Sequence, residues 1–172
     1  GPPSIDAIEL ARVVDRGIRE GHAMDVHGLV IESGKKVWNV IVDICTINSA
    51  GGLQDASALA AVAALEDARL PGLDTSSNDY VIDYKTKTDK KLPLANQPIT
   101  VTVFKLGDQL FVDPTDAEGK LYDARLSATV LANGKLCALQ KGGEGTANVD
   151  EINAMVELAV KKSEELRKAL KA

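Results

Sequence analysis

The chain has 172 residues, of which 45% are hydrophobic and 3% aromatic, and its formal net charge at pH 7 is −5. A chain of this length can bury a hydrophobic core and corresponds to one domain or to two small units. The negative charge excludes a protein that coats nucleic acid with its whole surface, so any RNA binding must be confined to a patch or shared with a more basic partner.

The two cysteines, Cys45 and Cys137, both lie in apolar segments that resemble strands. A free thiol in such surroundings behaves as a small hydrophobic group, and the spacing indicates neither a metal site nor a disulfide framework. No apolar run reaches the roughly 18 residues that are needed to span a bilayer, and no signal segment opens the chain. We therefore expect a soluble, cytoplasmic protein with reduced cysteines in its core.

The first predicted helix begins near Ser4 and ends at Gly21. Ser4 or Asp6 can cap it, and Glu9 has the capping-box spacing from Asp6. A 3.6-residue period places five apolar residues on one side of this helix: Ala7, Leu10, Ala11, Val14 and Ile18. The opposite side carries three basic residues, which we call the arginine stripe: Arg12, Arg16 and Arg19.

The arginine stripe has two interpretations. Three guanidinium groups on one helical face fit the bidentate geometry of successive phosphates, which predicts an RNA-binding surface. Alternatively, the stripe is a solvated or ion-paired face, because Asp15 and Glu20 lie at its edges. The residues alone favour the second interpretation.

The middle of the chain is predicted to contain a buried strand and an alanine-rich helix. Residues 28–32 resemble a short strand, and a turn at 33–36 leads from it into residues 37–47. This last segment is apolar or β-branched at nearly every position, which predicts a central strand shielded from water on both faces. A Gly51-Gly52 turn follows, and then a helix from about Gln54 to Glu66 whose small side chains let it lie close to that strand.

After this helix, residues 71–79 are expected to form a polar loop, and residues 80–84 a short strand. A lysine-rich loop follows, and its composition favours a solvated hairpin tip over a contact for RNA or an acidic partner; it carries Lys85, Lys87, Lys90 and Lys91. Four more strands are predicted by composition, over residues 99–106, 109–113, 125–131 and 135–140. The Asn133-Gly134 pair is typical of a type I′ hairpin turn.

A helix from about Val149 to Leu170 is the last predicted element. Acidic residues open it and basic residues close it, as the helix dipole favours. Six apolar residues share one face: Ile152, Met155, Val156, Ala159, Leu166 and Leu170. The order of elements predicts an α+β fold, in which helices pack on one face of a mainly antiparallel sheet.

Other groups that could carry chemistry give weaker signals. Residues 49–52 join a strand to a helix, but they lack the glycine spacing of a dinucleotide site and the Gly-Lys-Ser/Thr of a P-loop. A tight turn that lets Ala56 and Ala60 approach the sheet is the favoured interpretation. His22 and His27 have no partner at a telling spacing. Asp43 and Asp55 could form a carboxylate pair, but structural roles are favoured for both. The sequence therefore predicts no metal site and no cofactor.

Three segments together carry a resemblance to a known family: GPPSIDAIELARVVDRGIRE, VDICTINSAGGLQDASALAAVAAL and VDPTDAEGKLYDARL. They resemble the RNase PH superfamily and, within it, the non-catalytic ring subunit of the archaeal RNA exosome. The resemblance implies a two-layer fold of the ribosomal-protein-S5 domain 2-like kind. It also implies that the chain is one RNase PH-like domain over residues 1–172 that lacks its N-terminal strands, with 1–71 ending the first half and 72–172 forming the second.

The resemblance further implies that the catalytic positions are lost. Active members place an acidic residue before the glycine pair and a Thr/Ser-Arg dipeptide after it, where this chain has Ala50 and Leu53-Gln54. Their catalytic aspartate corresponds to Gly119, with Glu118 beside it and Asp116 three residues before. Phosphorolysis needs a bound phosphate next to a proton donor or a carboxylate that positions a metal, so we expect no catalytic residue in this chain.

The function implied by the resemblance is that of a silent, RNA-positioning subunit in a hexameric ring. It would support phosphorolytic 3′-to-5′ degradation of single-stranded RNA by a homologous catalytic subunit, whose site uses inorganic phosphate, together with RNA-binding cap proteins. The resemblance favours RNA binding by the arginine stripe, above all by Arg12. The alternatives are an active phosphate-dependent exoribonuclease that uses Asp116 or Glu118 with Arg12, and a binding module with no RNA role.

Overall fold

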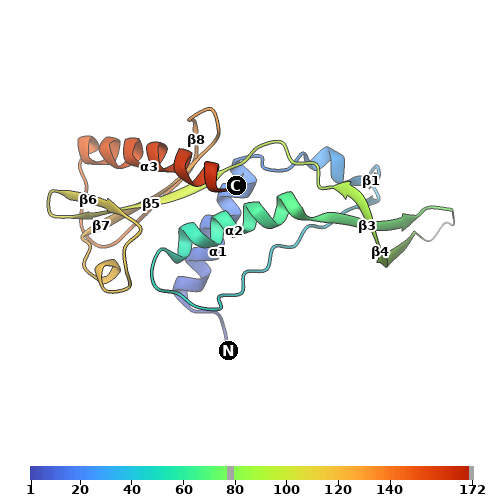
Figure 1. Ribbon diagram of the computed structural model, residues 1–172, viewed down its shortest axis with the longest axis horizontal. Helices are drawn as coiled ribbons and strands as arrows, with labels where there is room; N and C mark the ends of the chain where they lie inside the picture. Colours follow the sequence, from blue (N-terminus) through green and yellow to red (C-terminus); the bar gives the residue numbers. More distant parts are fainter. Residues whose placement is uncertain (77–79, 171–172) are drawn as a thin grey trace.

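The computed structural model describes residues 1–76 and 80–170 (Figure 1). These residues form three α-helices, α1 (Ile5–Glu20), α2 (Leu53–Asp67) and α3 (Val149–Ala169), and short 3₁₀ turns at Val26–Leu29 and Glu118–Lys120. Strand pairing in the described residues is antiparallel throughout. Figure 1 shows a four-stranded sheet with α3 at one end of the molecule, α1 and α2 in the middle, and a two-stranded hairpin that projects at the other end.

The four-stranded sheet has the order β6-β5-β7-β8 and holds the largest core cluster. Its strands are β5 (Ile99–Leu106), β6 (Gln109–Val112), β7 (Ala124–Val130) and β8 (Leu136–Gly142). The side chains of β5 and β7 meet α3 in a core that includes the fully buried Val103, Ala128, Met155 and Ala159. The four strands and the final helix predicted from the sequence are confirmed, with ends that differ by one or two residues.

The helix ends follow the expected capping rules. The Ser4 side chain accepts a hydrogen bond from the backbone N–H of Ala7 at 3.2 Å, and α1 ends before Gly21. Ser4 is therefore the N-cap, and Glu9 binds Arg125 instead of forming a capping box with Asp6. A full capping box between Asn148 and Glu151 starts α3. Within the described residues, no helix is both long and apolar enough to cross a bilayer.

The prediction of a central buried strand over residues 37–47 is wrong for this structure. Only Lys36–Val37 (β2) is paired, with Val30–Glu32 (β1), and Ile41 and Ile47 are 79% and 96% exposed. Within residues 1–76 and 80–170, no strand pairs with the rest of the segment. An apolar pattern favours a strand but does not provide the neighbours that bury it. Cys45, expected in the core, is consequently exposed.

The helix that follows this segment also packs differently from the prediction. Instead of lying against residues 37–47 as a central strand, α2 packs mainly on β5 and α1. Its buried residues include Ala58 and Ala61, whereas Ala56 and Ala60 are exposed. The small side chains thus allow a close approach to α1, where Ala58 and Ala61 contact Val14 in a small core cluster.

The loop predicted over residues 71–79 is also wrong in part. Residues Arg69–Asp74 form β3, which pairs with Val81–Lys91 (β4), while 77–79 lie outside the described residues. Pro71 is tolerated because β3 belongs to a two-stranded sheet, in which a strand has a free edge. The strand expected at 80–84 accordingly runs on through the lysine-rich segment, so these lysines lie on β4 and not in a loop.

The Asn133-Gly134 turn between β7 and β8 is not type I′. A type I′ turn needs positive φ at both central residues, but in the described chain the non-glycine residues with positive φ are His22 and Asp113. Gly134 alone has positive φ here, 78°. The Asn133 side chain instead accepts a hydrogen bond from the backbone N–H of Lys135 at 3.0 Å.

Candidate functional site

The three residues of the arginine stripe on α1 have different surroundings. Arg16 donates to the backbone carbonyl of Leu139 at 3.2 Å and to Gln140 Oε1 at 3.3 Å, both on β8. Since β8 is an edge strand of the four-stranded sheet, Arg16 ties α1 to the edge of that sheet. This contact gives Arg16 a structural role that the helical period alone does not reveal.

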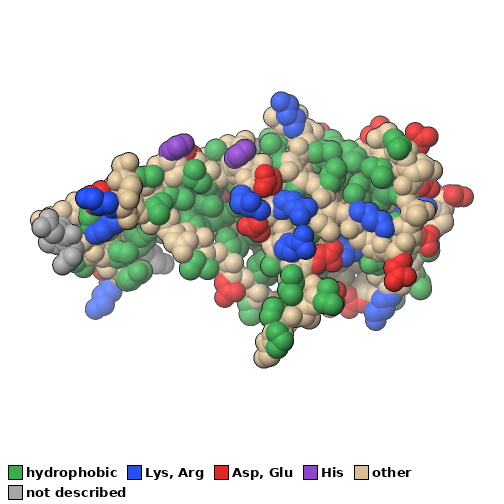
Figure 2. All heavy atoms as spheres, turned by 180° about the vertical axis from the view of Figure 1, so that it is seen from behind, with side chains coloured by type: hydrophobic (Ala, Val, Ile, Leu, Met, Phe, Trp, Pro, Cys, Tyr) green, Lys and Arg blue, Asp and Glu red, His purple; other side chains and the backbone are tan. Residues whose placement is uncertain are grey.

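The other two arginines differ in their partners. Arg19 pairs with Asp15 at 3.2 Å and with Glu20 at 3.4 Å. Arg12 is exposed and makes no ion pair with residues 1–76 or 80–170. Figure 2 shows the molecule from behind, and on this face basic side chains near the middle lie among acidic ones. Of the three predicted RNA-binding residues, Arg12 is therefore the exposed one whose charge is not matched by an ion pair within the described residues.

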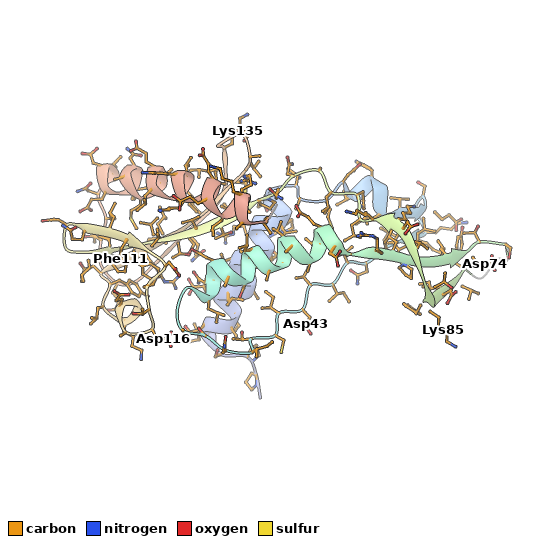
Figure 3. All side chains as sticks on the ribbon, in the orientation of Figure 1. Asp43, Asp74, Lys85, Phe111, Asp116 and Lys135 are labelled. Atoms are coloured by element: carbon orange, nitrogen blue, oxygen red, sulfur yellow. The ribbon has the colours of Figure 1, made fainter. Side chains whose placement is uncertain are left out.

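A cavity of about 350 Å³ lies at the N-terminal end of α2. Residues 49–52 form one side of it and the loop after β6 forms another; Figure 3 places Asp116 of that loop beside the start of α2. Arg125 of β7 and Thr102 of β5 also line the cavity. We call it the α2 pocket.

The glycine pair brings the two sides of the α2 pocket together. Gly51 and Gly52 have φ values of 129° and 60°. A Cβ atom on Gly51 would lie 1.9 Å from the carbonyl oxygen of Pro114, and the backbone N–H of Asp116 donates to the Ala50 carbonyl at 3.0 Å. The tight turn predicted here is confirmed, but the element that it approaches is the loop after β6 and not the sheet.

Arg125 makes several polar contacts in the α2 pocket that the sequence patterns do not reveal. Its guanidinium donates to Glu9 Oε2 at 2.6 Å, to Gln54 Oε1 at 3.0 Å and to the Tyr122 hydroxyl at 3.2 Å. The Arg125 side chain is only 13% exposed. Its charge is therefore neutralised by Glu9 of the same chain. The signal in the sequence that could have indicated this site is a basic residue, Arg125, in the mainly apolar strand predicted over residues 125–131.

Asp55 also lines the α2 pocket. Its carboxylate accepts the backbone N–H of Thr102 at 2.7 Å and contacts the Thr102 hydroxyl at 2.6 Å. Burial raises the pKa of Asp55 to about 6, Thr102 opposes this shift through its hydrogen bonds, and the nearby charge of Asp113 adds to it. Asp43 is exposed and lies on the unpaired segment before α2 (Figure 3). It lines a different cavity.

The two acidic candidates near Gly119 are differently engaged. The Glu118 carboxylate accepts from the Thr115 backbone N–H at 2.9 Å and from its hydroxyl at 2.8 Å, and these hydrogen bonds lower the pKa of Glu118. Glu118 thus holds its own 3₁₀ turn. Asp116 lines the α2 pocket, whereas Arg12 does not. The combination of Arg12 with either acid in one site is therefore not assembled in this structure.

The remaining candidates stay separate from the pocket. His22 and His27 are both exposed on the segment after α1. The described residues contain no group of three or more His, Cys, Asp or Glu side chains that could hold a metal ion.

The sequence matches the models of a known protein family. Residues 1–71 match the 3′ exoribonuclease family, domain 1, and residues 96–162 match domain 2 of the same family. The chain belongs to the 3′ exoribonuclease family. The resemblance to the RNase PH superfamily is thereby confirmed.

Relatives in this family include two archaeal proteins named exosome complex component Rrp42. The protein from Methanocella arvoryzae is 40% identical over 170 residues, which cover 99% of this chain and 62% of the relative. The protein from Thermococcus kodakarensis is 40% identical over 173 residues, covering 100% of this chain and 63% of the relative. The chain thus spans less than two thirds of the length of these relatives.

Solved structures agree with the sequence relatives. An archaeal exosome core superposes with a TM-score of 0.85 at 36% identity, covering 99% of this chain and 65% of the other. An Archaeoglobus fulgidus exosome with RNA bound to the active site gives a TM-score of 0.83 at 36% identity, covering 98% and 63%. The predicted RNase PH-like α+β fold is therefore confirmed.

Proposed function

We propose that this chain is a catalytically silent, RNA-positioning subunit of an archaeal exosome ring. In that role it supports phosphorolytic 3′-to-5′ degradation of single-stranded RNA by a homologous catalytic subunit. Family membership and the similarity to archaeal proteins named as exosome components support the place in a ring. The observation that carries the silent role is the internal neutralisation of Arg125 by Glu9 in the α2 pocket.

The α2 pocket is poorly suited to inorganic phosphate. Phosphate binding is favoured where basic groups outweigh acidic ones. The Arg125 guanidinium is already bound to Glu9, Gln54 and Tyr122. Lys120 is the other basic side chain of the lining, against the acidic Asp6, Asp55 and Asp116. At pH 7, above the pKa of about 6, the Asp55 carboxylate would repel an anion. In this proposal, inorganic phosphate is used at the site of the partner subunit, RNA-binding cap proteins join the ring, and the assembly acts in the cytoplasm.

A phosphorolysis assay tests the silent role. With single-stranded RNA and inorganic phosphate, we expect no release of nucleoside diphosphate by this chain, because phosphate and a free catalytic acid are not brought together. A mixture with a catalytic homologue is expected to release it, and chromatography of the products measures the rate. Release by this chain alone, lost on Asp116→Ala or Glu118→Ala, would instead establish the alternative of an active exoribonuclease.

The RNA-positioning role is tested at Arg12 in the assembled complex. Arg12→Ala is expected to weaken RNA binding about tenfold, since one charge-assisted phosphate contact is lost. It should also reduce the slope of log affinity against log salt concentration by about 0.7. Arg19→Ala is the matched control, because Arg19 is already paired with Asp15 and Glu20, and we expect a smaller effect. If the Arg12→Ala complex has the same RNA affinity and the same salt slope as the unchanged complex, Arg12 does not bind RNA. The arginine stripe would then be a solvated or ion-paired surface.

A further inference from the structure

Four polar side chains form a continuous chain of contacts between α2 and the four-stranded sheet. Asp55 Oδ1 lies 2.6 Å from the Thr102 hydroxyl, Thr102 lies 2.8 Å from the Ser127 hydroxyl, and Ser127 lies 2.9 Å from Gln54 Oε1. Thr102 and Ser127 are 4% and 2% exposed, so water has little access to the middle of this chain. Both ends are on the first turn of α2, and the middle is on β5 and β7.

The end of the chain at Gln54 can only accept hydrogen bonds. Arg125 Nη1 donates to the same Gln54 atom at 3.0 Å, and a guanidinium has donors only. The atom facing Ser127 is therefore the amide oxygen and not the amide nitrogen. Ser127 must donate its hydroxyl proton to Gln54 if this contact is a hydrogen bond.

The number of protons then depends on Asp55. The chain has three contacts, and the two hydroxyl groups of Thr102 and Ser127 supply one proton each. If Asp55 is ionised, both ends of the chain are acceptors and one of the three contacts has no proton. If Asp55 is protonated, it can donate to Thr102, Thr102 to Ser127 and Ser127 to Gln54, so that every contact is satisfied.

We propose that Asp55 is a proton-controlled latch: its acid form completes a one-way chain of hydrogen bonds that ties the first turn of α2 to β5 and β7. The second oxygen of the acid, Oδ2, continues to accept the backbone N–H of Thr102 at 2.7 Å. Ionisation leaves two buried oxygens in contact without a proton between them, which weakens the attachment of α2. This inference concerns the fold around the α2 pocket and does not depend on the proposed role in a ring.

The surroundings of Asp55 favour the acid form. Burial raises the pKa of this group to about 6 against the opposing effect of the Thr102 hydrogen bonds, and Asp113, which follows β6, acts in the same direction as burial. On the α3 side, Lys162 and Glu165 line a cavity with Asp55, but they are paired with each other at 2.9 Å. Three further charged groups line the α2 pocket, from α1 and from the loop after β6: Asp6, Asp116 and Lys120.

The latch gives a definite dependence of stability on pH. The folded-state pKa of Asp55 lies above its ordinary value of 3.8, so between these values the folded protein holds a proton that the unfolded chain has released. The stabilisation is fully present below about pH 4 and is lost as the pH rises through about 6. This behaviour is opposite to that of an aspartate held ionised by a salt bridge.

The test is a titration of the Asp55 carboxyl group by infrared or carboxyl-carbon NMR spectroscopy in the folded chain. We expect a carboxylic-acid signal with a midpoint near pH 6 that is missing in Asp55→Asn. Asp116→Asn, which alters another carboxylate of the same pocket, should leave that signal in place. A signal that titrates near pH 4, or one that survives Asp55→Asn, would overturn the proposal.

Ser127→Ala separates the hydrogen-bond chain from burial alone. Without the Ser127 hydroxyl, Thr102 is free to donate to an ionised Asp55, so the acid form loses its advantage. We expect the Asp55 midpoint to fall by about one pH unit, the change that corresponds to one net hydrogen bond. An unchanged or higher midpoint in Ser127→Ala would show that burial sets the titration and would refute the latch.

Discussion

Replacing Arg125 by methionine is expected to lower the free energy of unfolding by about 3 kcal/mol, because it leaves the carboxylate of Glu9 without a partner in a largely buried position. The Glu9 side chain is 24% exposed. Among the described residues Glu9 makes one ion pair, the 2.6 Å contact with Arg125. The loss also removes a donor from Gln54. Urea unfolding at pH 7, followed by circular dichroism, measures the effect.

A control is Lys35→Met, which breaks a pair with Glu32 on the β1–β2 hairpin in which the lysine is 71% exposed. This change should cost less than about 0.5 kcal/mol, as is usual for surface pairs. The double variant Glu9→Leu with Arg125→Met should recover much of the loss, since no charge is then left unpaired. A cost for Arg125→Met as small as that of Lys35→Met would mean that the Arg125 network is not fixed in solution.

The expected cost of Arg125→Met comes from a contact between residues far apart in the chain. Arg125 and Glu9 are separated by 116 positions, and only the stacking of α1 beside the sheet brings them together. The sequence did predict the elements that carry them, because caps, periodicity and turn residues are local signals. It could not predict the neutralised guanidinium, because helix and strand patterns state which face is polar and not which polar groups meet.

The arginine stripe shows the same limit. A period of 3.6 residues correctly placed Arg12, Arg16 and Arg19 on one side of α1, and the i,i+4 spacing of Asp15 and Arg19 indicated their pair. The binding of Arg16 to the edge of β8 could not be expected, since Leu139 is 123 positions away. The RNA-binding role of the stripe and the division of the chain into residues 1–71 and 72–172 stay predictions.

Residues 37–47 illustrate a different cause of error. Their composition is that of a central strand, but strand propensity mainly reports how side chains pack against neighbours on a sheet. Val40 and Val42 line a cavity beside α1, whereas Ile41 and Ile47 remain exposed. The pattern thus identified a segment that is able to form a buried strand, and the described residues do not supply the strands that would bury it.

Replacing Gly51 by alanine is expected to lower the free energy of unfolding by about 3 kcal/mol, from two causes that act together. The backbone has a φ of 129°, which L residues rarely adopt, and the added Cβ would lie 1.9 Å from the Pro114 carbonyl oxygen. The residue cannot avoid this atom by a change of rotamer, because the Cβ position is fixed by the backbone. The loop after β6 must therefore move, and the hydrogen bond from Asp116 N–H to the Ala50 carbonyl is lost.

Gly34→Ala provides the control for backbone strain alone. Gly34 also has positive φ, 75°, but a Cβ there meets nothing within 4 Å, so we expect a cost of about 1 kcal/mol. Urea unfolding of both variants gives the difference, and amide NMR shifts of residues 113–120 report whether the loop has moved. Similar costs for the two variants, with unchanged shifts in this loop, would mean that residues 49–52 and the loop do not hold this close contact in solution, and the α2 pocket would then be open on that side.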